Sequence, residues 1–128
     1  MMPNKIRKYR RKAYQQQHGL CFYCGKPMWL DDLHAFANRY AITISQAKQF
    51  RCTAEHLIAK QDGGKNSQTN IAAACIFCNR LRHARKMPLA PLEYKKIVLK
   101  RLRKSGWNAF VPLSQNCVSP QTYASWMV

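Results

Sequence analysis

The spacing of apolar residues predicts helices in three parts of the chain. Residues 1–18 are predicted to form a basic helix or arm, which Gly19 ends. Residues 31–50 begin with two aspartates, which suit a helix N-terminus, and continue with apolar residues one helical turn apart. We therefore expect a helical insertion there. Residues 91–104 repeat the helical spacing, with lysines and arginines between the apolar positions.

Two short apolar runs, "RCTAEHL" and "NIAAACI", predict strands. The polar, glycine-rich stretch between them, "IAKQDGGKNSQT", is too long for a tight hairpin turn but suits a compact loop. After Cys75, "IFCNRLRHARKM" has helical character and is stopped by Pro88. The pattern predicts an α+β fold, and a length of 128 residues favours one domain with a modest core.

The charge of the chain indicates its partner. Lysine and arginine number 22 against 5 acidic residues, and the net charge of +17 is concentrated in residues 1–12, 80–86 and 95–104. Such a chain is expected to bind a polyanion, and we predict nucleic acid. A solvated helix face and an anionic membrane surface are the alternatives, although the basic blocks do not alternate with acids as solvated faces usually do. The candidate contact residues are Lys5, Arg7, Lys8, Arg10, Arg11, Lys12, Arg80, Arg82, Arg85, Lys86, Lys100, Arg101, Arg103 and Lys104.

The six cysteines fit either a disulfide scaffold or a metal site. A secreted disulfide scaffold would use this number of cysteines, but the basic N-terminus lacks the apolar run and cleavage site of a signal peptide. We therefore expect a cytoplasmic protein with reduced thiols. No apolar stretch approaches the length that crosses a bilayer, so no membrane partner is predicted.

Four of the cysteines form two Cys-x-x-Cys pairs, "CFYC" and "CIFC". Two such pairs on one ion give a tetrahedral, closed site, which predicts structural Zn²⁺. Fifty residues separate the pairs, but the penalty for closing a loop rises only slowly with its length. Unconnected thiol pairs or redox motifs are the alternatives, and Cys52 and Cys117 are expected to be buried packing residues. The predicted zinc ligands are Cys21, Cys24, Cys75 and Cys78.

Six motifs follow one another along the chain: Cys-x-x-Cys, Glu55-His56, Gly63-Gly64, Asn70-Ile71, Cys-x-x-Cys-Asn79 and His83. Their order resembles that of the HNH nucleases, the ββα-metal family, in its zinc-stapled form. The resemblance covers residues 21–24 and about 52–86, and it is specific because six elements occur in one order. It implies a small ββα-metal core, stapled by zinc and flanked by basic α-helices. Asn79 stands where many members have histidine, so the pattern is the HNN variant, and Arg82 stands where lysine is frequent.

The resemblance also implies a role for each motif residue. His56 would be the general base, because imidazole titrates near neutral pH. Glu55, Asn79 and His83 would hold a divalent cation, Mg²⁺ or another such as Mn²⁺ or Ni²⁺, that stabilises charge on the phosphate. Asn79 and His83 are four residues apart on the predicted helix and so share a face. Asn70 would bond the backbone near His56 and fix its ring.

Together these features predict a metal-dependent HNH endonuclease that cuts double-stranded DNA. Its expected parts are a basic arm over 1–20, a nuclease core over 21–90 with the insertion at 31–50, and a basic helix with an uncharged tail over 91–128. The tail is the segment we would nominate for a homodimer contact. The rival is a non-catalytic, zinc-stapled nucleic-acid-binding protein, either ribosome-associated or a degenerate nuclease that binds without cutting.

Overall fold

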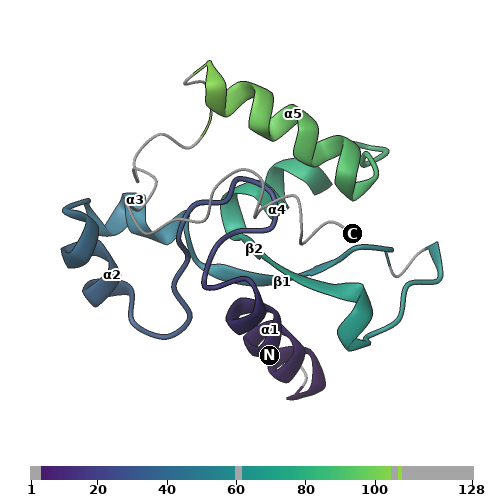
Figure 1. Ribbon diagram of the computed structural model, residues 1–128, viewed down its shortest axis with the longest axis horizontal. Coiled ribbons are helices and arrows are strands. Elements are labelled where there is room, and N and C mark those ends of the chain that lie inside the picture. The colour runs from purple at the N-terminus through teal and green to yellow at the C-terminus, as the bar shows by residue number, and fades with distance from the viewer. Residues whose placement is uncertain (1–3, 60–61, 105–106, 108–128) are drawn as a thin grey trace.

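The computed structural model describes residues 4–59, 62–104 and 107, and a two-stranded antiparallel sheet lies at its centre (Figure 1). Strand β1 (Cys52–His56) pairs with β2 (Ile71–Cys75), so that Cys52 lies opposite Cys75 and His56 opposite Ile71. Helix α4 (Ile76–His83) follows β2 directly and contacts both strands. The predicted α+β class is confirmed, with the strand, strand, helix order of a ββα unit.

Helix α1 (Asn4–Gln16) lies on the other side of this hairpin from α4 (Figure 1). Gln17 ties its end to β2, because its Nε2 donates to Ala73 O at 2.8 Å and its Oε1 accepts from Ala73 N at 2.9 Å. His18 and Gly19 then adopt left-handed φ angles of 57° and 75°, which end the helix where the sequence predicted. All five residues of β2 are buried between these two layers.

The stretch 31–50 folds as two helices, α2 (Leu33–Tyr40) and α3 (Ile44–Lys48), beside the hairpin (Figure 1). Asp32 caps α2 by accepting from Ala35 N at 2.9 Å, and Thr43 and Gln46 cap α3 reciprocally. The pair encloses its own small core around Phe36 and Phe50, which are 7% and 0% exposed. Burying one such side chain stabilises the folded state by roughly 1.5–3 kcal/mol, which favours packing of these two helices against each other.

Helix α5 (Pro91–Arg103) places Tyr94 and Val98 in the main core, and Tyr94 OH donates to Cys78 O at 2.7 Å. A single 3₁₀ turn (Gln68–Asn70) leads into β2. Of the predicted tail the structure describes Trp107 alone, so the nominated dimer contact and Cys117 lie outside the described residues. Among the described helices none has the length and apolar character needed to cross a membrane.

Candidate active site and metal centre

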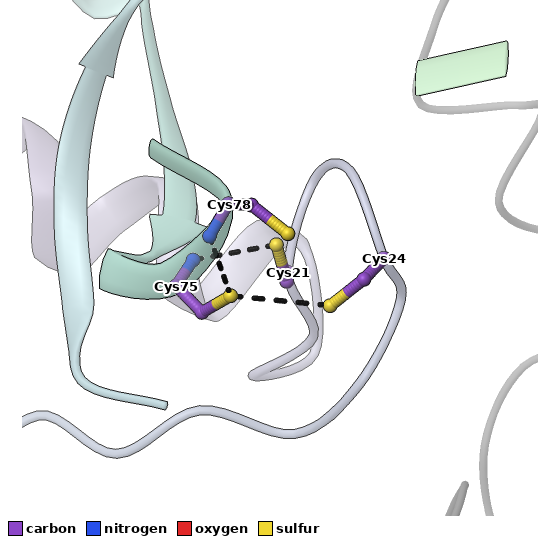
Figure 2. Close-up of side chains that lie close together, drawn as sticks. All are labelled: Cys21, Cys24, Cys75 and Cys78. Carbon is purple, nitrogen blue, oxygen red and sulfur yellow. Dashed lines mark hydrogen bonds between the residues drawn. The ribbon is translucent and has the colours of Figure 1, made fainter. Parts of the chain in front are cut away.

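The two Cys-x-x-Cys pairs come together at the start of α4, with their sulfur atoms turned toward one another (Figure 2). All four residues are buried, and the four Sγ atoms lie within 4.8 Å of one another, with Cys24 and Cys75 4.0 Å apart. Four sulfurs about 2.3 Å from a tetrahedral zinc ion lie about 3.8 Å apart. The cluster therefore fits a structural zinc ion with little movement. The residues are Cys21, Cys24, Cys75 and Cys78.

The thiols of this cluster differ in their tendency to ionise. Burial raises the pKa of Cys21, but hydrogen bonds from the other three thiols outweigh burial and hold that pKa well below its usual value. Burial and the contact with Cys21 raise the pKa of Cys75 and Cys78 well above the usual value. Cys75 and Cys78 therefore hold their protons near neutral pH until a metal ion displaces them. A dication that replaces the remaining protons would satisfy all four sulfurs.

Several neighbours complement the charge of the cluster. Trp107 Nε1 donates to Cys78 Sγ at 3.2 Å. The side chain of Lys95 is 1% exposed, its ammonium lies 4.8 Å from the centre of the Phe22 ring, and burial lowers its pKa to about 8 against the attraction of nearby thiolates. Cys52 is also buried, but it stands outside the cluster, and burial raises its pKa to about 12. The thiol of Cys52 therefore stays protonated near neutral pH, which agrees with the packing role expected for Cys52.

Strand β1 turns two side chains toward α4, and each meets a residue of that helix. Thr53 Oγ1 accepts from Asn79 Nδ2 at 2.9 Å, and Glu55 Oε1 lies 2.9 Å from His83 Nε2. The contacts fall in order because Thr53 and Glu55 share a face of the strand, while Asn79 and His83 share a face of the helix. The structure thus brings Glu55 and His83 into direct contact and places Asn79 one step along the same row.

The Glu55–His83 contact suits two ligands of one divalent cation. Two adjacent ligands of an octahedral ion at about 2.1 Å lie about 3.0 Å apart, which is the separation of Glu55 Oε1 and His83 Nε2 within 0.1 Å. The side chain of His83 is 38% exposed, so water or substrate can reach this position, whereas that of Glu55 is 2% exposed. A carboxylate oxygen is a suitable donor for Mg²⁺ or Mn²⁺, and an imidazole nitrogen is a suitable donor for Ni²⁺ and similar transition-metal ions.

The second oxygen of Glu55 is occupied by protein groups. Arg82 lies 3.2 Å from Oε2, and Tyr23 OH donates to the same atom at 3.1 Å. Arg82 also donates to Leu89 O at 3.0 Å, and its side chain is only 5% exposed. This corrects the sequence prediction, which assigned Arg82 to nucleic-acid contact: a buried carboxylate requires an opposing charge, and Arg82 supplies it. Arg10, another predicted contact residue, is likewise buried, at 8% exposure.

His56 follows Glu55 on β1 and points to the opposite side of the strand. Its Nε2 lies 2.7 Å from Asn66 Oδ1 in the loop between the strands. Because an amide oxygen can only accept, this contact requires Nε2 to be the donor, which leaves Nδ1 as the ring nitrogen that can accept a proton. Sequence reasoning missed Asn66, since a single asparagine in a polar loop carries no distinguishing pattern.

Asn70 fastens this loop to the end of β1. Its Oδ1 accepts from Ile58 N at 2.8 Å, and its Nδ2 donates to Ile58 O at 3.0 Å and Lys65 O at 2.9 Å. The sequence predicted a bond to the backbone near His56, and the bond falls two residues beyond it. Gly64 permits the close approach, because a Cβ there would lie 1.7 Å from Ile58 O. The loop can then return and place Asn66 beside His56.

The hairpin, its helix and the buried cysteine cluster define a small ββα-metal domain. The family model of the HNH endonucleases matches residues 44–85, which run from the start of α3 through the hairpin to just beyond α4. Residues 44–85 thus match the HNH endonuclease family, and the resemblance seen in the sequence is confirmed for this segment. No curated protein and no solved structure matches the chain. The HNH match indicates a nuclease or nucleic-acid-related function.

Proposed function

We propose that the protein is a metal-dependent HNH endonuclease that hydrolyses phosphodiester bonds of double-stranded DNA. The observation that carries this proposal is the 2.9 Å contact between Glu55 Oε1 and His83 Nε2, which offers two cation ligands at a solvent-accessible position. His56 lies next to Glu55 in the strand with its ring oriented by Asn66, as a general base requires. A base and a cation site on adjacent residues fit hydrolysis better than simple binding.

In this proposal each residue has a defined task. His56 Nδ1 takes a proton from a water molecule as the water oxygen attacks phosphorus and the bond to the leaving oxygen breaks. Asn70 and Asn66 hold the loop and the ring of His56 in place. Glu55 and His83, with Asn79 beside them, would hold the divalent cation, which when bound stabilises charge that develops on the phosphate and leaving oxygen.

The basic helices supply the proposed contact with DNA. Twelve of the fourteen candidate residues are exposed, which leaves out the buried Arg10 and Arg82. Exposed lysine and arginine side chains can neutralise backbone phosphates without reading sequence. The proposed contacts are Lys5, Arg7, Lys8, Arg11, Lys12, Arg80, Arg85, Lys86, Lys100, Arg101, Arg103 and Lys104.

One observation favours the non-catalytic alternative. Glu55 already contacts Tyr23, Arg82 and His83, so its carboxylate is satisfied by protein groups alone. A degenerate nuclease that binds nucleic acid through its zinc-stapled fold could retain this network for stability. The two functions differ in whether His56 matters for the activity of the protein.

Plasmid nicking by the full chain tests the proposal. With Mg²⁺, Mn²⁺ or Ni²⁺ the protein should nick or linearise plasmid DNA, and His56→Ala should lower the rate by about 10²–10⁴-fold. His34→Ala is the matched control, because His34 is exposed on α2 and lies outside the matched segment 44–85. Equal cutting by wild type and His56→Ala would contradict the assignment, and no cutting under any of the three metals would favour the binding protein.

A further inference from the structure

A groove outside the HNH motif residues lies between the helical insertion and α4, with a volume of about 610 Å³. Three exposed cations line it: Lys48 at the end of α3, Arg51 just before β1, and Arg80 on α4. None of the five acidic residues of the chain is among the groove residues. The rest of the lining is mostly apolar, including Phe77 and the 41%-exposed Leu81, and its two polar residues, Ser45 and Gln49, are uncharged. An anionic ligand with apolar parts would complement this surface.

Backbone hydrogen bonds hold the two sides of the groove together. Ile76 N donates to Arg51 O at 2.9 Å, and Phe77 N donates to Gln49 O at 3.2 Å, so residues 49–51 run along the first turn of α4. On the insertion side, Trp29 Nε1 donates to Ala47 O at 2.8 Å. Lys48 and Arg51 are therefore carried on a backbone that is fixed relative to the HNH helix.

The register of β1 relates the groove to the candidate active site. Arg51 precedes β1 and alternates along the chain with Thr53 and Glu55. Arg51 lines the groove, whereas Thr53 and Glu55 contact Asn79 and His83 of α4. Four residues of strand at about 3.3 Å each separate Arg51 from Glu55 by about 13 Å. One strand of DNA advances about 3.4 Å per nucleotide along the helix axis, so this distance corresponds to about four nucleotides.

We infer that this groove binds backbone phosphates of a DNA strand about four nucleotides from the phosphate at the Glu55–His83 position, with Lys48 and Arg51 as contacts. The inference rests on the proposed function, because the distance is counted from a scissile phosphate at the Glu55–His83 position. The groove lies in line with that position and with the neighbouring Thr53–Asn79 contact. At the other end of α4, Arg85 and Lys86 line a second groove beside His83. Cations thus lie at both ends of the row, as a strand crossing the site requires.

Binding of a fluorescent DNA duplex by the zinc-loaded full chain, measured by anisotropy over a range of salt concentrations without added catalytic metal, tests this inference. Lys48→Gln/Arg51→Gln should make the slope of log affinity against log salt shallower by about 2, because each lost phosphate contact removes about 0.9. The affinity at about 0.1 M salt should fall on the order of tens-fold. Glutamine keeps the side chains long and suits the end of α3.

The matched control is Arg39→Gln/Lys96→Gln, which removes the same charge from exposed positions on α2 and α5 outside the groove. Its slope should stay close to that of wild type. The charge-conserving variant Lys48→Arg/Arg51→Lys should keep the wild-type slope of log affinity against log salt. A merely structural effect of changing these two side chains would alter the slope in this variant as well. Equal slopes for the groove variant and the control would overturn the inference.

Plasmid cutting by the same proteins separates this inference from the proposed function. If wild type binds DNA through the groove but cuts it with none of the three metals, the hydrolysis proposal fails and the inference that the groove binds DNA is supported. If wild type cuts while the groove variant binds and cuts like the control, the groove fails and the hydrolysis proposal stands.

Discussion

Replacing Arg82 with methionine tests the buried charge network around Glu55. The side chains of Arg82 and Glu55 are 5% and 2% exposed, and their charged groups lie 3.2 Å apart. Removing one partner of such a pair leaves an uncompensated charge inside the protein, at a cost of about 3–5 kcal/mol. Leu89 O also loses its 3.0 Å donor, which adds about 1 kcal/mol. We therefore expect Arg82→Met to lower the free energy of unfolding by about 4–6 kcal/mol.

Urea unfolding of the zinc-loaded proteins measures this difference. Lys86→Met is the matched control, because Lys86 is an exposed cation four residues further on, and its loss should change the free energy of unfolding by no more than about 0.5 kcal/mol. The double variant Glu55→Gln/Arg82→Met also removes the negative charge that Arg82→Met leaves unpaired. Its loss in free energy of unfolding should therefore be smaller, by about 0.5–3 kcal/mol, than the sum of the losses in the two single variants. If Arg82→Met costs no more than Lys86→Met, Arg82 is not paired inside the protein and the reasoning is wrong.

The remaining predictions concern the zinc cluster and the loop. Elemental analysis should find one zinc per wild-type chain and markedly less in Cys75→Ser; full retention in the variant would refute the four-cysteine site. Lys95→Met should release zinc to a chelator faster than wild type, because Lys95 is a buried cation close to the thiolates, and an unchanged rate would exclude that role. Gly64→Ala should slow plasmid nicking, since its Cβ would lie 1.7 Å from Ile58 O, and a variant that nicks at the wild-type rate would show that the loop tolerates displacement. Asn70→Ala should lower the free energy of unfolding, measured in urea, by about 1–3 kcal/mol, because it leaves loop backbone groups unpaired. An unchanged free energy would show that these hydrogen bonds do not stabilise the fold.

The elements of the HNH segment could be predicted because their signals are local. Short apolar runs predicted both strands, and the structure has β1 at Cys52–His56 and β2 at Ile71–Cys75. Helical spacing with a proline stop similarly predicted α4 (Ile76–His83). The short spacing within each Cys-x-x-Cys pair predicted metal ligands, because one turn suffices to aim both thiols at an ion.

The pairing of side chains across elements could not be predicted in the same way. Arg82 belongs to a basic block in the sequence, and nothing local distinguishes it from its exposed neighbours Arg80 and Arg85. Its burial follows from Glu55, which β1 directs against α4, and only the packing of strand on helix creates the low-dielectric site where that carboxylate needs a partner. Asn66 meets His56 for a comparable reason, since the loop returns only when Asn70 and Gly64 hold it against β1.

By itself, the sequence determined the α+β class, four cysteines suited to holding one metal ion, the order of the HNH motifs and a net charge that favours a polyanionic partner. The contact between Glu55 and His83 agrees with what the resemblance implied. The tertiary structure alone decided that Arg82 stabilises the buried carboxylate of Glu55 and that Lys48 and Arg51 join Arg80 in one groove. The physical reason is range. Turns, caps and periodicity act over a few residues, whereas the partners of a buried charge and the cations around a groove come from segments that only folding brings together.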